Sequence, residues 1–211
     1  MKALSPLTIT ISLGILAAVS LPIIAQQSQR YPTENELQQL MKGFRNFVAS
    51  PPEGSRGFYL RDPRNAAQSQ DLKAFVRAWL PVNPDIAPFI GQWTALEETT
   101  SIYPSSIRGR ACIVETFIPP KPDIGISFAV GTVSGKSIKT SNLTVLLQQG
   151  NYLGVAFINT SNDRPGIYEY AWPKPLTNPA ELVRGVPPAK RNQLLQQFKE
   201  AGCTHALPQQ R

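Results

Sequence analysis

Histidine and cysteine are almost missing from this chain, whose 211 residues include one histidine, His205, and two cysteines, Cys112 and Cys203. A catalytic triad needs a histidine held beside its nucleophile, whereas His205 lies in the C-terminal tail, where we expect it to face solvent. One histidine and two cysteines also cannot supply the close group of ligands that a zinc site of soft donors requires. These absences argue against histidine-dependent hydrolysis, and we expect no metal and no cofactor.

A phosphate-binding loop is missing as well, although the segment from Gly131 to Ser137 resembles one. Three residues instead of four separate Gly131 from Gly135. The residues after Ser137 favour a strand, whereas a phosphate loop is followed by a helix. We therefore predict a hairpin turn at this position.

Long runs of charge of one sign are also missing. The formal net charge is +7, but there is no block of five or more basic residues and no basic tail. Dispersed charge of this kind gives only a weak preference for acidic partners or anionic surfaces, and we expect no nucleic acid as a partner.

The N-terminal segment has the features of a cleavable export signal. Lys2 provides a positive start, the residues from Leu7 to Leu21 carry no charge, and Ala25 offers a small residue at the cleavage position. We predict a signal peptide over residues 1–25 and a mature protein outside the cytoplasm, periplasmic or secreted, that is not an integral membrane protein. The alternative is an uncleaved anchor, because an apolar run of about 19 residues could just cross a bilayer.

The two cysteines are best interpreted as one disulfide. In an oxidising compartment, an isolated pair is most simply oxidised, and a redox pair usually has close spacing. Cys112 lies in a strand-like run and Cys203 just beyond a helical one. The bond would attach the C-terminal helix to the sheet and, by closing a loop of about 90 residues, would stabilise the fold by roughly 4 kcal/mol.

Helical patterns dominate residues 26–88. Apolar residues recur at helical spacing over 33–48, after a capping box of Thr33 and Glu36, and again from Ser69 to Leu80. The run over 57–60 between these helices is predicted as a short strand. We treat residues 26–88 as an N-terminal helical segment.

The C-terminal segment, residues 176–211, returns to helical patterns. Asn178 precedes a proline at a first helical position, and Pro187-Pro188 opens a last helix that Gly202 would cap.

The middle of the chain, residues 89–175, is predicted to be β-structure. Short apolar or alternating runs are separated by turn residues, and no helical crossover interrupts them, so neighbouring strands should be antiparallel. The expected strands are Gln92–Thr99, Ala111–Ile118, Ile126–Val133, Ser137–Thr140, Leu143–Gln148, Tyr152–Asn159 and Gly166–Trp172, with Ser101–Tyr103 as a possible eighth. The predicted fold class is α+β: an antiparallel meander sheet or small β-barrel, with N-terminal helices and a C-terminal helix packed on it.

Aromatic residues are the most distinctive feature of the β region. On the inside of a barrel, alternate aromatic side chains can line an apolar cavity with a few polar tips. The same rings could instead fill a solid core. The candidate ligand-binding residues are Trp93, Phe128, Tyr152, Tyr168 and Tyr170.

Arginines suggest a second function. Arg61 and Arg64 form one loose cluster, and Arg108 and Arg110 form another. Guanidinium groups bind carboxylates and phosphates through paired hydrogen bonds, so these four residues could dock an acidic macromolecular partner. A solvated loop is the alternative interpretation.

Carboxylates in predicted strands suggest a third function. Glu97, Glu115 and Glu169 could converge in a cleft, and glycoside hydrolysis uses two carboxyl groups at a defined separation. Such a hydrolase would use Glu115 and Glu169 and would require both on one concave surface. Strand residues alternate between faces, and many simply face water.

The run Pro88-Phe89-Ile90-Gly91-Gln92-Trp93 resembles the start of a lipocalin or related calycin barrel. In that family a Gly-x-Trp begins the first strand after a short helical turn, and its tryptophan packs at the closed end of the barrel. The resemblance implies an eight-stranded barrel that carries a small apolar ligand. The alternative is an exported family with a small barrel of its own. Our first expectation is therefore an exported, non-catalytic binding protein.

Overall fold

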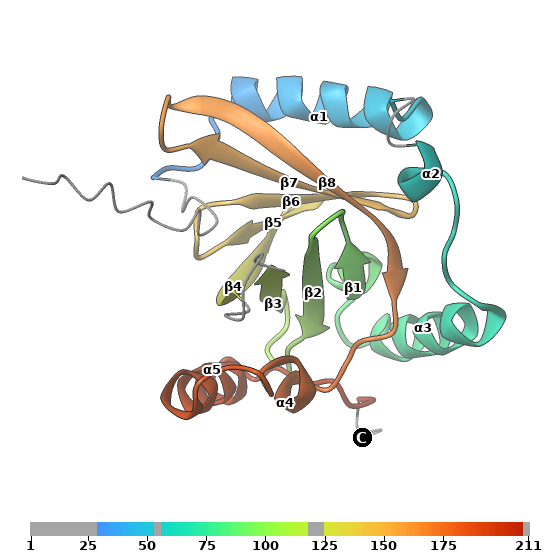
Figure 1. The fold of residues 1–211 in the computed structure, drawn as a ribbon, viewed down its shortest axis with the longest axis vertical. Helices are drawn as coiled ribbons and strands as arrows, with labels where there is room; N and C mark the ends of the chain where they lie inside the picture. Colours follow the sequence, from blue (N-terminus) through green and yellow to red (C-terminus); the bar gives the residue numbers. More distant parts are fainter. Residues whose placement is uncertain (1–28, 53–55, 118–124, 209–211) are drawn as a thin grey trace, which may run out of the picture.

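The computed structural model describes residues 29–52, 56–117 and 125–208. The predicted signal peptide, residues 1–25, lies outside the described residues. The chain forms an eight-stranded barrel with helices on its outside (Figure 1), which confirms the predicted α+β class.

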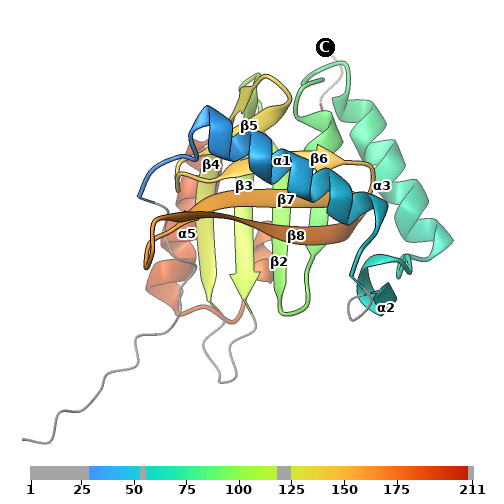
Figure 2. The same cartoon turned by 90° about the horizontal axis from the view of Figure 1, so that it is seen from above.

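The first helix, α1 (Glu34–Ala49), begins at the predicted capping box. The Thr33 hydroxyl accepts a hydrogen bond from the amide of Glu36, whose carboxylate accepts one from the amide of Thr33 at 2.7 Å. Arg30 donates to the same carboxylate, and this bond is the main reason that the pKa of Glu36 falls to about 2. The apolar face of α1, with Phe44 at its centre, packs on β7 and β8 (Figures 1 and 2).

The second predicted helix starts earlier than expected. This helix, α3 (Ala66–Trp79), begins after Asn65, which forms a capping box with Gln68. An asparagine with glutamine three residues later has the same cap chemistry as threonine with glutamate. The start near Ser69 was predicted from the spacing of apolar residues alone, without this capping box.

The predicted strand at 57–60 is wrong, because residues 57–59 belong to the short helix α2 (Arg56–Tyr59) and Leu60 follows it in a bend. A strand of four residues needs a neighbour to satisfy its backbone groups, and the barrel closes without it. The helical turn instead places Tyr59 against the barrel. The Tyr59 hydroxyl donates to the carbonyl of Glu169 at 3.1 Å, and the Tyr152 hydroxyl donates to the carbonyl of Tyr59 at 2.8 Å.

A short 3-10 turn, η2 (Ala87–Phe89), leads into the barrel, as the resemblance to the Gly-x-Trp barrels implied. The strands are β1 (Gly91–Thr94), β2 (Glu98–Pro104), β3 (Arg110–Phe117), β4 (Ile126–Ser134), β5 (Ser137–Thr140), β6 (Val145–Gln149), β7 (Tyr152–Asn159) and β8 (Arg164–Lys174). Each strand pairs antiparallel with the next, and β1 pairs with β8 to close the barrel.

Two boundaries in this barrel differ from the prediction. The single strand expected over 92–99 is two strands, because the chain turns between Thr94 and Glu98, where the amide of Ala95 donates to the carbonyl of Glu98. The possible eighth strand at Ser101–Tyr103 is the middle of β2. The segment that resembles a phosphate loop is the β4–β5 hairpin, as predicted, with Gly135 at a positive φ of 63° in its turn.

Two helices follow β8 and cover a different side of the barrel from α1 (Figure 1). They are α4 (Pro179–Leu182) and α5 (Pro188–Glu200), which bury Val183, Leu194 and Phe198 against β3 and β4. The chain leaves α5 through Gly202, whose φ of 70° is the left-handed conformation predicted for this cap.

The disulfide predicted between Cys112 and Cys203 is present, with 6.0 Å between the two Cα atoms. It connects β3 to the chain just after α5. The carbonyl of Gly202 accepts from the amide of Ser106 at 2.8 Å, and the amide of Thr204 donates to the carbonyl of Pro104 at 3.0 Å. The disulfide and these two hydrogen bonds therefore hold the C-terminal tail on the β2–β3 connection.

Candidate functional site

The two ends of the barrel interior differ in chemistry. Side chains alternate between the inside and outside of each strand, so one buried residue fixes the direction of its neighbours. Ile102, Ile113 and Ala129 belong to the interior cluster, whereas Tyr103 and Cys112 pack outside against α5. Toward one end the interior is filled by apolar side chains from the strands, η2 and α3.

Trp93 lies at this closed end and is 1% exposed. Its indole N–H donates to the carbonyl of Phe89 in η2 at 2.7 Å. Phe89, Ile90 and Trp79 pack in the same cluster. The position of Trp93 is the one that the resemblance implied.

The opposite end of the interior, which we call the open end, carries polar side chains. Counting by two from Ile102 places Thr100 and Glu98 inside, and counting by two from Ile113 places Glu115 inside. Thr100, Glu115 and Ser127 are directly paired across β2, β3 and β4. The interior at this end therefore holds two carboxylates.

Hydrogen bonds connect these carboxylates to hydroxyl groups on two other strands, β4 and β8. The Ser127 hydroxyl donates to Glu115 at 2.8 Å, and the Tyr170 hydroxyl, from β8, donates to Glu98 at 3.0 Å. The Thr100 oxygen faces the same cluster near Tyr170, and it is buried without a hydrogen bond of ordinary geometry to any described residue. The cluster therefore has unused capacity for hydrogen bonds.

Burial raises the pKa values of Glu115, Glu98 and Tyr170 in this cluster. The pKa of Glu115, which is 8% exposed, is raised mainly by burial, and nearby Glu98 raises it further. Burial is also the main reason that the pKa of Glu98 is raised, against the opposing effect of its bond from Tyr170. The pKa of Tyr170 lies well above its usual value because of burial first and the two carboxylates next. Both carboxyl groups therefore lose their protons at a higher pH than a free glutamate does.

Tyr168 connects the buried cluster to the surface. It is 37% exposed, and its ring lies 5.2 Å from the ring of Tyr170, centroid to centroid, in an edge-to-face arrangement. Burial first, and then Glu98 and Glu97, raise its pKa.

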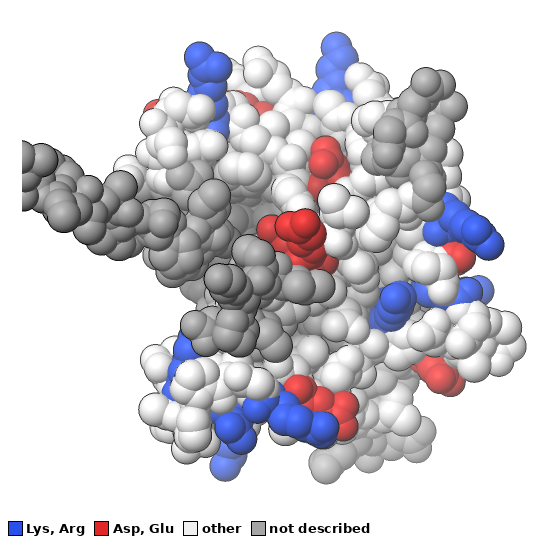
Figure 3. All heavy atoms as spheres, viewed as in Figure 1, with Lys and Arg blue, Asp and Glu red and all other residues white. Residues whose placement is uncertain are grey.

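Acidic side chains gather near the centre of the face shown in Figure 3, whereas lysines and arginines lie around them.

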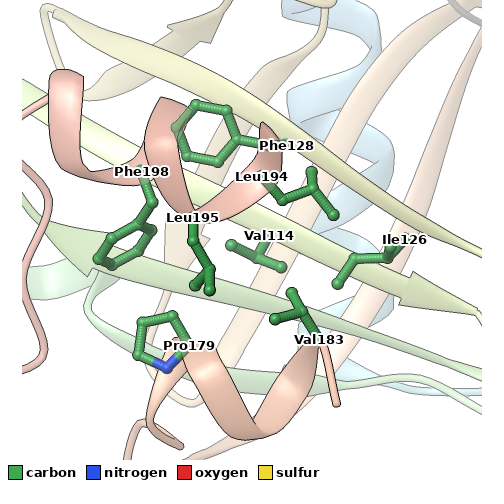
Figure 4. Close-up of a pocket in the computed structure, with 8 residues that line it drawn as sticks. All are labelled: Val114, Ile126, Phe128, Pro179, Val183, Leu194, Leu195 and Phe198. Carbon is green, nitrogen blue, oxygen red and sulfur yellow. The ribbon is translucent and has the colours of Figure 1, made fainter. Parts of the chain in front are cut away.

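The five aromatic residues predicted to bind a ligand do not share one cavity. Tyr168 and Tyr170 meet at the open end, whereas Trp93 lies at the closed end. Tyr152 lies outside the barrel beneath α1, and Phe128 lies outside beneath α5. The space beside Phe128 is a cavity of about 10 Å³ lined by apolar side chains (Figure 4), room for about one water molecule.

The carboxylates predicted for hydrolysis are also on different faces. Glu115 points inside, but Glu169 lies between Ile167 and Ala171, which pack outside with α1. Glu97 is exposed on the β1–β2 turn. The second carboxylate inside the barrel, next to Glu115, is Glu98. The sequence did not indicate it, because the turn after Thr94 was not recognised. Without that turn, the residues of this segment that face the interior could not be assigned.

The predicted arginines occupy two separate segments. Arg64 is held by Asp62 at 2.7 Å and donates to the carbonyl of Pro173 at 3.0 Å. Arg61 is exposed beside it, whereas Arg108 and Arg110 lie on the β2–β3 connection and at the start of β3. No described contact joins the two pairs.

The described residues contain neither a cluster of metal ligands nor a membrane-spanning helix. Within 29–52, 56–117 and 125–208, no three or more histidine, cysteine or acidic residues come together as a metal site would require. In the same part of the chain, no helix combines the length and apolar character needed to cross a membrane.

The fold and the site define a class: a closed, eight-stranded antiparallel barrel with an apolar closed end and a carboxylate–tyrosine cluster at its open end. No protein-family model matches the chain, and no curated protein or solved structure matches it either.

Proposed function

We propose that this is an exported binding protein that takes up a small molecule at the open end of its barrel. The ligand would present a hydrogen-bond donor, most simply an ammonium group, to Glu98 and Glu115, and an apolar ring to Tyr168. The observation that carries this proposal is the presence of two hydrogen-bonded carboxylates inside the barrel.

The energetic cost of this cluster supports a functional role. A buried carboxyl group without full compensation costs free energy, and apolar residues fill the rest of the interior. Groups with perturbed pKa values inside a concave site are candidates for binding or catalysis. A cluster that is costly in the empty protein is compensated when a ligand supplies the missing partner.

An ammonium group fits the hydrogen-bond inventory of the cluster. It has three donors and no acceptor, and Glu98, Glu115 and Thr100 carry oxygen atoms on the inside of the barrel, where Thr100 is paired with Glu115 and Glu98 acts on the pKa of Glu115. A positive charge at this point would also lower the pKa of both carboxyl groups. Binding would therefore release protons.

The aromatic side chains at the open end would contact the rest of the ligand. Tyr168 and Tyr170 form an edge-to-face pair, and the Tyr168 ring is exposed enough to accept a second ring. This arrangement retains the aromatic contact expected of a barrel that binds an apolar ligand, but it confines that contact to the open end.

Two features support the exported and barrel-binding parts of the proposal. The Cys112–Cys203 disulfide is a kind of bond that persists in oxidising compartments, consistent with the predicted signal peptide. Gly91 and Trp93 follow a short helical turn, as in the lipocalin-like barrels that the sequence resembles.

The test is calorimetric titration of the mature protein with 2-naphthylmethylammonium, a ring that carries an ammonium group. We expect tighter binding at pH 8 than at pH 5, because the carboxyl groups must lose protons. Glu115→Gln and Glu98→Gln should each weaken binding by tenfold or more, since a hydrogen bond to a charged group contributes about 1.5–3 kcal/mol.

Glu97→Gln is the matched control, because Glu97 is an exposed acid next to Glu98 on the same turn. Its affinity should stay within about twofold of the parent, as expected for a weakly interacting surface charge. Equal loss in all three variants would mean that only general negative charge matters, and no loss in any of them would contradict the proposal. Native mass spectrometry of protein purified from its own host would show whether a natural ligand accompanies it.

A further inference from the structure

A groove of about 460 Å³ lies on the outside of the barrel, where β1 and β8 close the wall. Phe58 and Arg61 line it from the α2 side, and Thr94, Trp172 and Lys174 line it from the barrel. Its volume lies within the range typical of small-molecule sites.

The pairing of β1 with β8 shapes this groove. Gln92 pairs with Lys174, and Thr94 pairs with Ala171, so one residue on β1 faces two on β8. This is a β-bulge, a feature that redirects side chains and occurs often next to binding sites. Here the bulge contains Trp172.

Trp172 is held in an unusual state. Its φ of 54° is rare for a large side chain, and its indole nitrogen is buried without a hydrogen-bond partner among the described residues. The ring packs 5.9 Å from the ring of Tyr152, and the Arg64 guanidinium lies 5.5 Å from its centre. Strained residues of this kind are concentrated at ligand sites.

Charge in the groove is unbalanced. Among the described residues that line it, the one acidic residue, Asp62, is occupied by Arg64, which approaches it at 2.7 Å and also donates from its Nε at 2.9 Å. Arg61 and Lys174 form no ion pair with any described residue. The groove therefore offers two cationic side chains to an incoming anion.

We propose that this groove binds a small aromatic carboxylate. Arg61 and Lys174 would hold the carboxylate through charge-assisted hydrogen bonds, and the Phe58 and Trp172 rings would pack on its flat ring. The charge requirement is opposite to that of the cluster inside the barrel, so the two sites select different ligands and the two proposals stand independently.

The test uses 2-naphthoate, which has the same ring system as the amine probe with the opposite charge. Binding to the disulfide-bonded protein is followed through the indole N–H signals in ¹H–¹⁵N spectra, with Trp172→Phe identifying the Trp172 signal. We expect the Trp172 signal to move on titration while the signal of Trp93, which is bonded inside the closed end, stays in place. Neutral 2-naphthylmethanol should bind at least tenfold more weakly.

Arg61→Gln with Lys174→Gln should weaken naphthoate binding by tenfold or more and leave the affinity for the amine probe unchanged. Lys190→Gln, which removes an exposed cation on α5, is the matched control and should leave both affinities unchanged. Glu115→Gln should weaken the amine probe alone, so that failure of one site is distinguished from failure of the other.

Three outcomes would overturn the inference. The first is naphthoate binding that the double variant does not change, and the second is equal binding of naphthoate and 2-naphthylmethanol. The third is binding of an oligoglutamate peptide that depends on Arg61 and Lys174 while naphthoate fails to bind, which would assign the groove to an acidic protein partner instead.

Discussion

The closed and open ends of the barrel interior are filled by side chains of opposite character, apolar at the closed end and polar at the open end. At the closed end, Trp93 packs among apolar side chains and its one polar group donates to Phe89. At the open end, Glu115 is buried and Glu98 is half-buried, the pKa values of both are raised, and Thr100 lacks an ordinary partner. The apolar arrangement raises the free energy of unfolding, whereas the polar arrangement lowers it. Such a loss of stability is typical of a binding site.

The largest expected effect is at the closed end. Trp93→Ala removes a fully buried ring and its hydrogen bond, so the free energy of unfolding should fall by about 3–5 kcal/mol. Chemical denaturation of the mature protein measures this value. A loss below about 1 kcal/mol would mean that the closed end is not the stable part of the barrel.

The disulfide provides the next test, because it holds the C-terminal tail on the β2–β3 connection. Replacing Cys112 and Cys203 together by alanine should lower the free energy of unfolding by roughly 4 kcal/mol, the entropy of closing a loop of about 90 residues. Denaturation of the double variant beside the oxidised parent gives the difference. An unchanged midpoint would show that α5 is held on the barrel by packing alone.

The smallest change in the free energy of unfolding is expected at the open end, where removing a carboxylate should stabilise the protein at high pH instead of destabilising it. Because burial raises the pKa of Glu115 in the folded state, the folded protein keeps a proton that the unfolded chain loses as the pH rises above about 4.3. The free energy of unfolding should therefore fall as the pH rises from that value through the folded-state pKa, and then level off.

Glu115→Gln should reduce the fall in the free energy of unfolding with rising pH, because the amide keeps an acceptor for Ser127 and never ionises. The variant should match the parent near pH 4 and be the more stable protein at pH 8, by about 1.4 kcal/mol for each unit by which the pKa is raised. Denaturation curves at several pH values, with Glu97→Gln as the control, measure the difference. A variant that is less stable than the parent at pH 8 would remove the distinction between the two ends.

Local patterns predicted much of the fold. The capping box at Thr33, the left-handed Gly202 and the hairpin at Gly135 each depend on residues within a few positions of one another. The disulfide was predictable because only one pairing of two cysteines exists. The short helix α2 was missed because its contacts with β7 and β8 come from residues about a hundred positions away.

The candidate site was less accessible to prediction. Glu115, Tyr168 and Tyr170 were identified as chemically interesting, but Glu98 and Thr100 were not. A single unrecognised turn, between Thr94 and Glu98, left open which side chains of this segment face the interior. Side-chain direction in a strand reverses with each residue, so an error of one position changes the chemistry assigned to both faces.

The sequence by itself determined the class of the fold, the strand order of a hairpin meander and the cross-link to the tail, because these follow from local periodicity and from the number of cysteines. Only the tertiary structure decided that the meander closes through an irregular β1–β8 pairing, that Glu98 and Glu115 share one interior, and that Arg61 and Lys174 meet in one groove. The physical reason is that closure of the barrel brings together residues far apart in the chain, and the positions that it joins depend on the register of every strand between them.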